Sequence, residues 1–441
     1  MTRITRVLTV GGCALAVIML SSEVVAAHPQ QADRPATQST APEAPQTGQG
    51  EDYDRLITIR QMSDRAIVVT IAGGDTTNVV ALKTARGVVV VDTTVSPVLA
   101  RAVRRRIDQA FGGAPIAAVI NTHGHGDHAY GNQVFAGSLI IGHTKAPVDL
   151  AAGKEALGRS LAAIKAAVPR LEAQLRTLDA TSDKALRLQS TVLHYQAMLE
   201  GLSTDFTFTP PWLTFTDQLA LDLGDRRLEL TSYGAAHSGS DIIIHCPEEG
   251  LWMTGDLFAA GRDPYVDSER IAALDRWAAN LDRILSSAAA TRAIVPGHGA
   301  LLSAADVQKT KEFVRSQQKL YAGRESAFKA FKAIYERAGV DEAVTALRRF
   351  RSEPNRYFVL HLEIDTYAYR LMNSGHLDDA LKIFTVLAGY FPEDWQSFDS
   401  LGEVQLKLGQ TKQAAESFRK SLVLDPNNQN AMEKLKTLEK K

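Results

Sequence analysis

One stretch of eight residues, 121–128, constrains this chain more than any other. It reads Asn-Thr-His-Gly-His-Gly-Asp-His and holds four candidate metal ligands, which are His123, His125, Asp127 and His128. Imidazole and carboxylate groups at this density suit a divalent cation such as zinc. The interleaved glycines adopt backbone angles that other residues resist, so a short turn can direct several side chains at one centre. Because the apolar residues 117–120 precede the stretch, we expect a metal loop at the carboxyl end of a buried strand.

Three more candidate ligands stand in separate turns, each after an apolar run. They are His237, Asp256 and His298, and each lies beside glycine or another small residue. Ligands far apart in sequence can meet in this way at one edge of a sheet. The remaining histidines lack such a setting, and we interpret them as ordinary surface or core residues. They are His28, His143, His194, His245, His361 and His376.

Apolar runs alternate with helix signals between about residue 53 and residue 303. Strands are predicted for residues 56–59, 66–71, 78–82, 87–92, 117–120, 139–141, 219–223, 228–232, 241–245, 251–254 and 293–295. Helices are predicted for residues 96–111, with Ser96 as N-cap and Pro97 at the first position, and for residues 268–286. Two similar halves of this kind predict an α/β fold, a sandwich of two sheets with helices outside. Cys246 follows an apolar run and is interpreted as a small buried residue.

Residues 150–203 interrupt this rhythm with a helical pattern. Apolar residues from Leu157 to Leu178 are spaced alternately by four and three, and a similar series runs from Ala185 to Leu202. We expect two antiparallel helices, the first kinked at Pro169. Such a hairpin either packs against itself or forms a wall or dimer surface beside the metal loop.

From residue 304 to residue 441 the pattern is helical throughout. Four residues recur at a distance of 34, the period of a tetratricopeptide repeat, as Gly375/Gly409, Ala380/Ala414, Phe384/Phe418 and Pro392/Pro426. Two repeats are few for a free-standing array, so we expect this tail to pack against the preceding domain or another subunit. We interpret this region as a tail that stabilises the protein or mediates its dimerisation. The expected partner of the tail is a second copy of the chain or another protein.

The first 52 residues have the pattern of an export signal followed by a linker. Residues 1–27 have arginines, an apolar core and a small-residue cleavage site, which predicts a signal peptide and a secreted or periplasmic protein without a membrane anchor after processing. Residues 28–52 lack large apolar side chains and are predicted to be a disordered linker. The length of 441 residues suits two or three domains, and a net charge of -1 gives no reason to expect a nucleic-acid partner.

Residues 53–303 resemble the metallo-β-lactamase-fold superfamily, because Asp92, the metal loop, His237, Asp256 and His298 follow the order of its signature elements. The resemblance implies a four-layer αβ/βα sandwich, here with a helical-hairpin insertion and an all-α tail. It also implies two zinc ions, with iron or manganese as alternatives. By the same resemblance His123, His125 and His237 bind the first metal, while Asp127, His128 and His298 bind the second. Asp256 would bridge the two metals, and Asp92 would orient the metal loop from outside the ligand set.

The resemblance implies hydrolysis of a small molecule by a metal-bound hydroxide, held between cations about 3.5–4 Å apart. Asp127 is the candidate for a catalytic proton carrier. Glyoxalase-II-like and lactonase-like branches place an acid where this chain has Asp256, which favours an ester-type bond such as a thioester or lactone. The alternatives are a class B-like β-lactamase, or an interaction protein in which the repeats act and the metal domain is a scaffold. Arg262 or Tyr265 is either part of a plain turn or lies at the pocket rim.

Overall fold

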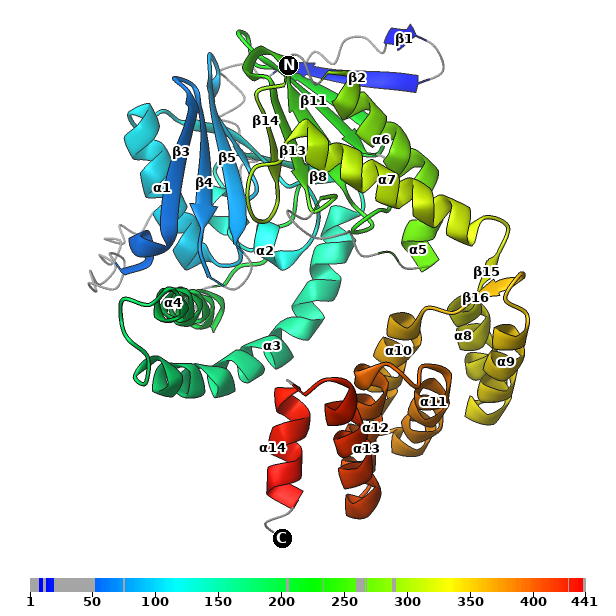
Figure 1. Ribbon diagram of the computed structural model, residues 1–441. Helices are drawn as coiled ribbons and strands as arrows, with labels where there is room; N and C mark the ends of the chain where they lie inside the picture. The colour runs from blue at the N-terminus through cyan, green and yellow to red at the C-terminus, as the bar shows by residue number, and fades with distance from the viewer. Residues whose placement is uncertain are drawn as a thin grey trace, which may run out of the picture. The chain divides into compact units, whose positions relative to one another are not determined.

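The computed structural model describes the chain from Leu8 to Leu438 with several gaps. The described residues are 8–10, 13–19, 52–73, 76–203, 206–232, 234–258, 266, 268–287, 291–426 and 428–438. They form two compact units (Figure 1). The first unit, here the catalytic unit, comprises Met1–Tyr265 and Ala273–Ser316, and the second, the helical unit, comprises Val266–Ala272 and Gln317–Lys441.

The first sheet of the catalytic unit has seven strands in sequence order. They are β3 (Ile57–Ser63), β4 (Ala66–Ile71), β5 (Thr77–Thr84), β6 (Gly87–Val91), β7 (Ile116–Ile120), β8 (Leu139–His143) and β9 (Leu213–Phe215). The strands β3 to β6 pair antiparallel, and β6 to β9 pair parallel. The strand β9 has only three residues and escaped prediction, because so short a run has no readable period.

The second sheet completes the sandwich. Its strands are β10 (Gln218–Asp222), β11 (Arg227–Ser232), β12 (Ile242–Cys246), β13 (Leu251–Gly255) and β14 (Ala293–Pro296). The backbone segments β1 (Leu8–Val10) and β2 (Cys13–Met19) extend this sheet, with β2 parallel to β10. Both segments fall within residues 1–27, for which the signal peptide stays a prediction.

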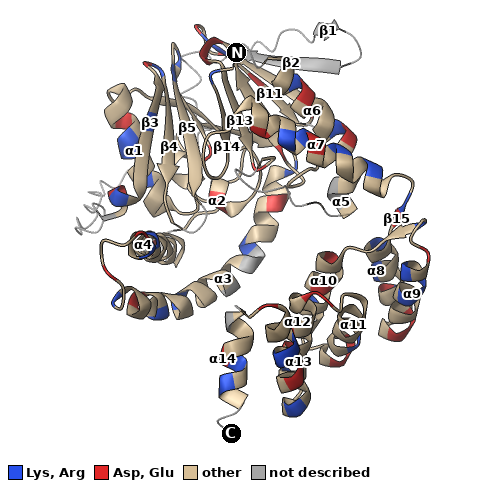
Figure 2. Ribbon diagram, in the orientation of Figure 1, with Lys and Arg blue, Asp and Glu red and all other residues tan. Residues whose placement is uncertain are grey.

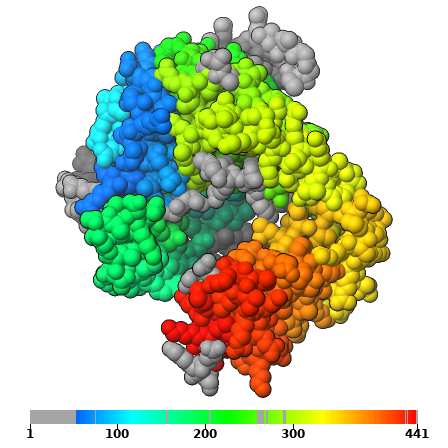
Figure 3. Space-filling view, viewed as in Figure 1, coloured from blue at the N-terminus to red at the C-terminus, as the bar shows by residue number. Residues whose placement is uncertain are grey.

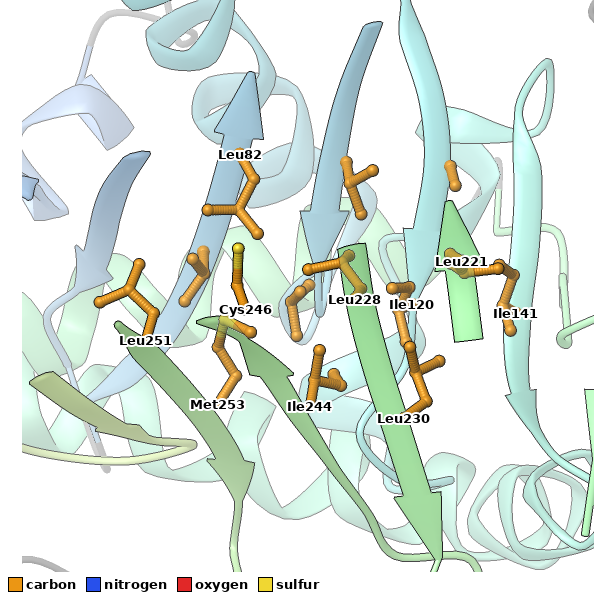
Figure 4. Packing of buried hydrophobic residues seen from close by; sticks show 14 of the residues in the cluster. Leu82, Ile120, Ile141, Leu221, Leu228, Leu230, Ile244, Cys246, Leu251 and Met253 are labelled. Atoms are coloured by element: carbon orange, nitrogen blue, oxygen red, sulfur yellow. The ribbon is translucent and has the colours of Figure 1, made fainter. Parts of the chain in front are cut away.

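The core lies between the facing sheets. Leu82, Ile120 and Ile141 of the first sheet point toward Leu228 and Ile244 of the second, as Figure 4 shows. Cys246 is fully buried in the same cluster, as its apolar surroundings predicted. Since successive strand residues face opposite sides of a sheet, the other face of the first sheet forms a second apolar cluster.

Helices cover the outer faces of both sheets. The helix α1 (Pro97–Phe111) packs on the first sheet, and the backbone N–H of Leu99 donates to Ser96 Oγ at 3.4 Å, which confirms the predicted N-cap. The helix α6 (Leu274–Ser286) lies at the second sheet, where Arg283 pairs with Glu229 of β11. It is followed by α7 (Ala304–Tyr321). The predicted sandwich with outer helices is therefore confirmed (Figure 1).

The hairpin insertion consists of α3 (Ala146–Leu175) and α4 (Asp183–Ser203), with Pro169 inside α3. Ala197 of α4 joins the apolar cluster on the outer face of the first sheet. In the space-filling view the hairpin, in green, lies against the blue strands of that sheet (Figure 3). The insertion thus packs on the sandwich as well as on itself.

The helical unit repeats a spacing of 34 residues more often than the sequence pattern indicated. It contains α8 (Ala327–Ala338), α9 (Val340–Ser352), α10 (His361–Asn373), α11 (Leu377–Tyr390), α12 (Trp395–Lys407), α13 (Thr411–Leu424) and α14 (Gln429–Leu438). The helices α8, α10, α12 and α14 begin at 327, 361, 395 and 429, and each start is 34 residues after the last. The equivalent residues Phe384 and Phe418 are both fully buried. Three helix pairs and a final helix therefore follow one period.

The predicted helix over 268–286 is divided between the two units. Its first part, α5 (Ser268–Ile271), belongs to the helical unit, whereas α6 belongs to the catalytic unit. The backbone N–H and the hydroxyl of Ser268 donate to Glu363 of α10 at 2.8 and 2.6 Å. A pattern of apolar residues cannot reveal that neighbouring turns join different units.

The charged side chains have no single-sign distribution along the helices. Figure 2 shows basic and acidic residues side by side on α7, α9 and α13, in line with the sequence net charge of -1. None of the helices in the described part of the chain has the length and apolarity to cross a membrane.

Candidate metal centre

All seven predicted ligands lie at the ends of strands or in the turns that follow them. The metal loop follows β7 and continues into the short helix α2 (Gly126–Ala129). His237 follows β11, Asp256 follows β13 directly, and His298 follows β14. The structure brings these residues together in two groups that could each hold a metal ion.

The first group contains His123, His125 and His237. The Nδ1 atom of His125 lies 3.0 Å from Nε2 of His123 and 3.0 Å from Nε2 of His237. Ligand atoms at 2.0–2.1 Å from a tetrahedral zinc ion are separated by about 3.3–3.4 Å. The spacing of the three nitrogens is therefore close to one face of such a site.

The second group contains Asp127, His128, Asp256 and His298. Nε2 of His298 is 3.0 Å from Oδ2 of Asp127 and 3.2 Å from Nε2 of His128. His128 is fully buried, while the side chain of Asp127 is 38% exposed. This group therefore opens toward solvent on the Asp127 side.

Asp256 belongs to the second group and also lies close to the first. Its Oδ2 atom is 3.4 Å from Nε2 of His237 in the first group and 3.3 Å from Nε2 of His298 in the second. Its Oδ1 atom is buried, lies 3.5 Å from Nε2 of His128 and has no hydrogen-bond partner among the described residues. A buried carboxylate oxygen without a partner is costly, and a cation would satisfy it. The donor set and this oxygen fit two divalent metal ions.

The electrostatics of the site reflect clustered carboxylates and imidazoles. Burial lowers the pKa of His298, but Asp127 and Asp256 outweigh it and raise that pKa to about 9. Burial, together with His128, lowers the pKa of His123 well below its usual range. For Asp256, burial raises the pKa, yet the charges and hydrogen bonds of the histidines bring it below its usual range. The carboxylates are thus held in the ionised form that metal binding needs.

Asp92 fixes the metal loop from outside the ligand set. Its Oδ1 accepts from the backbone N–H of Thr122 at 2.8 Å, and its Oδ2 accepts from the hydroxyl of Thr122 at 2.8 Å. Oδ2 also lies 2.9 Å from Nδ1 of His128. Asp92 adopts a left-handed backbone with φ 64°, which strains a residue with a Cβ atom. The position supports the role that the resemblance implied for this acid.

Asp241 holds the turn of His237 in a similar way. Its Oδ2 accepts from the backbone N–H groups of Ala236, His237 and Ser238 at 3.1, 2.7 and 2.8 Å. Burial raises the pKa of Asp241 to about 6 even though these bonds favour the ionised form. The turn is therefore held by a single buried carboxyl group.

Glycines are required where backbone and ligands approach closely. A Cβ atom at Gly297 would lie 2.1 Å from Oδ1 of Asp256 and 2.8 Å from Cε1 of His128. At Gly255, whose φ is +52°, it would lie 2.7 Å from Oγ1 of Thr122. These contacts explain why the ligand turns contain glycine at these positions.

The sequence prediction missed several residues around the ligands. They are Thr122, Asp149, Ser240 and Asp241, which have no ligand-type spacing. The first three act through contacts distant in sequence. Asp241 stands in the same turn as His237, so a search for acids next to ligand turns would have found it. Arg262 and Tyr265, considered for the pocket rim, lie outside the described residues.

The other histidines have separate settings. His143 is buried with Nε2 3.0 Å from the carbonyl of Thr216, and His245 stacks on Trp252 at a centroid distance of 3.9 Å. His194 is buried on α4, and its Nδ1 has no partner in the described part of the chain. None of them belongs to either metal group among the described residues.

Comparison with known proteins agrees with this architecture. Residues 72–298, more than half of the 441 residues, match the Metallo-beta-lactamase superfamily. Similar solved structures include a metallo-beta-lactamase from Pontibacter korlensis, at 14% identity and a TM-score of 0.42, covering 59% of this chain and 99% of that one. Another is the metallo-beta-lactamase FIM-1 from Pseudomonas aeruginosa in its mono-zinc form, at 14% identity and a TM-score of 0.40, covering 59% and 96%.

Structural similarity at this sequence identity and TM-score says nothing about the activity of this chain. No curated protein matches the chain. The family match and the two intact groups of ligands decide the assignment. The chain belongs to the metallo-beta-lactamase superfamily and is a metal-dependent hydrolase.

Proposed function

We propose that this protein is a dinuclear zinc hydrolase that cleaves an ester-type bond, such as a thioester or lactone, in a small molecule. The observation that supports it best is the position of the Asp256 carboxylate, within 3.3–3.4 Å of a histidine nitrogen in each group. A carboxylate in that place suits a ligand shared by two cations. The glyoxalase-II-like and lactonase-like branches have an acid at this point, whereas class B β-lactamases usually have another residue.

Two bound cations would supply Lewis acidity and a water molecule of lowered pKa. The remaining tasks belong to the protein. The histidines and Asp256 would hold the cations, and Asp92 fixes the orientation of His128. Asp127 is the candidate proton carrier, and it is the most exposed carboxylate of the group. Burial raises its pKa, but the charge and hydrogen bonds of His128 and His298 bring it well below its usual range, so it is a weak base.

We propose that the protein acts outside the cytoplasm and that the helical unit is a tetratricopeptide-type tail. Residues 1–27 support export through their signal-peptide pattern. The helix starts at 327, 361, 395 and 429 support a repeat of 34 residues. The tail would stabilise the enzyme or contact a protein partner or a second copy of the chain.

The test is turnover of a panel of chromogenic substrates by zinc-loaded protein that holds two metals per chain. The panel contains a thioester, a lactone and a β-lactam, and each is assayed beside chelator-treated protein. Zinc-dependent cleavage of the thioester or lactone, lost in Asp256→Asn and kept in Gly137→Ala, would support the proposal. Fast opening of the β-lactam alone would replace it with the lactamase alternative. The Gly137 variant is a suitable control because a Cβ atom there would meet nothing within 4 Å.

A further inference from the structure

Asp149, in the first turn of the hairpin insertion, is connected to the first metal group by two short hydrogen bonds. The hydroxyl of Ser240 donates to Oδ2 of Asp149 at 2.6 Å, and the backbone N–H of Gly124 donates to Oγ of Ser240 at 2.9 Å. Gly124 lies between His123 and His125, and Ser240 is three residues after His237. One hydroxyl group therefore joins the two turns that hold all three histidines.

The direction of these bonds makes Asp149 the residue that orients the hydroxyl. A serine hydroxyl has one proton to donate and two lone pairs with which to accept. A carboxylate only accepts, so the proton of Ser240 points to Asp149 and a lone pair remains for the Gly124 N–H. Ser240 is fully buried, and its only other side-chain contact among the described residues is Ser238 Oγ at 3.4 Å. Without Asp149 the hydroxyl would lose its acceptor at 2.6 Å and keep only Ser238 Oγ at 3.4 Å.

The start of α3 is also pressed closely against both turns. A Cβ atom at position 124 would lie 2.7 Å from Cβ of Asp149 and 2.6 Å from the carbonyl oxygen of Ala146. At Gly239 it would lie 3.1 Å from Oδ1 of Asp149. The two glycines are therefore what allow the helix to approach both turns so closely.

We propose that Asp149 is a positioning residue for the first metal and that the first turn of the hairpin is part of the metal centre. This inference rests on the dinuclear centre proposed above and adds that the hairpin does more than border the site. It acts through Ser240, which holds the His123–His125 loop against the His237 turn. Residues that orient metal ligands in this way typically contribute 10- to 100-fold to metal affinity.

Four variants of the full-length protein separate this role from a general effect on the hairpin. Asp149→Ala and Ser240→Ala remove the two ends of the contact. Asp149→Asn keeps a carbonyl oxygen that can accept from Ser240. Asp183→Ala is the matched control, because Asp183 is an exposed acid in the first turn of α4, the other helix of the hairpin.

The measurement is titration of chelator-stripped protein with Zn²⁺ in competition with a chromophoric chelator, without any substrate. For Asp149→Ala and Ser240→Ala we expect one of the two dissociation constants to rise 10- to 100-fold while the other changes less than threefold. The double variant, Asp149→Ala with Ser240→Ala, should bind zinc no more weakly than either single variant, since both changes remove the same contact. The zinc dissociation constants of Asp149→Asn and Asp183→Ala should stay within about threefold of the wild-type values.

Two outcomes would overturn the inference. One is unchanged affinity in Asp149→Ala, and the other is an equal loss in Asp149→Ala and Asp183→Ala, which would mean that the hairpin is only generally weakened. Binding of fewer than two zinc ions by the wild type would instead contradict the proposed dinuclear function. Circular dichroism of the metal-free variants identifies any that fail to fold. If Asp149→Ala fails to fold, Ser240→Ala decides the question, because unchanged zinc affinity in that variant would overturn the inference.

Discussion

Oδ2 of Asp92 and Nδ1 of His128 lie 2.9 Å apart, and both side chains are almost fully buried. Because a carboxylate only accepts, Nδ1 must be the protonated nitrogen, which leaves Nε2 free as a metal ligand. Nε2 faces Asp127 and His298 at 3.4 and 3.2 Å. The acid that ends the central strand thus selects the tautomer of a ligand that follows in the next loop.

Asp92→Asn should weaken binding of the second metal by about 10- to 100-fold. The amide N–H₂ would face Nδ1 of His128 and stabilise the other tautomer, which places a proton on the ligand nitrogen. Titration of the stripped protein with Zn²⁺ measures the change. If both dissociation constants matched those of the wild type, Asp92 would have no role in selecting the tautomer.

Gly297→Ala should damage the site directly, because the added methyl group would meet a ligand. The added Cβ atom would overlap Oδ1 of Asp256 and press on His128, so Asp256 must move. We expect a cost of about 1–3 kcal/mol in stability and at least a tenfold loss of zinc-dependent turnover. Gly137→Ala provides the comparison, because its Cβ atom would meet nothing. Equal stability and equal turnover of the two variants would contradict the close packing of Gly297 against Asp256.

Removal of the metals should destabilise the catalytic unit selectively. Zinc at 100 times its dissociation constant stabilises the folded state by about 2.7 kcal/mol for one site. The metal groups lie in the catalytic unit, and the described part of the helical unit contains none. Calorimetry with and without chelator should therefore shift one thermal transition and leave the other in place. A shift of both transitions would show that the units unfold together.

The helical unit should become less stable as the pH rises from about 4 to about 6. Burial, together with the carboxylates of Asp394, Glu403 and Asp399, raises the pKa of Asp365 to about 6. The folded state then retains a proton that the unfolded chain has released, so stability falls between the unfolded pKa of about 3.9 and the folded pKa of about 6. The loss from this group is on the order of 2–3 kcal/mol.

Urea unfolding of metal-free protein at pH 4.5 and pH 7.5 measures this loss. Asp365→Asn should reduce the difference between the two conditions, because the amide does not ionise. Asp378→Asn, at an exposed site in the first turn of α11, should keep the wild-type difference. An unchanged difference in Asp365→Asn would assign the pH dependence to other groups.

The ligands could be read from the sequence because each one sits in a turn after an apolar run. Strand ends, glycines and metal-binding residue types are local signals, and they located both groups and the capped helix at Ser96. The residues that position the ligands could not be predicted in the same way. Asp149 reaches Ser240 across 91 positions, and no local pattern encodes such a pair.

Boundaries were harder to predict than elements. The hairpin was expected from residue 150, yet α3 begins at Ala146, and Pro147 in its first turn was an unused signal for the earlier start. This difference matters, because the four added residues include Asp149. The period of 34 was predicted from two repeats only. In the preceding helix pair Ala346 and Phe350 keep two of the four marker residues, but Asp341 and Phe358 replace the glycine and the proline.

The assignment of Val266–Ala272 to the helical unit limits how the two units can be exchanged in evolution or by design. The chain leaves the catalytic unit after Tyr265, returns at Ala273 and leaves again after Ser316. A stop codon after Ser316 would remove Glu363, and Ser268 would then lack the carboxylate that it contacts. A gene fusion at a single joint would leave the same defect. A chimera that exchanges the helical unit must therefore replace residues 266–272 together with residues 317–441.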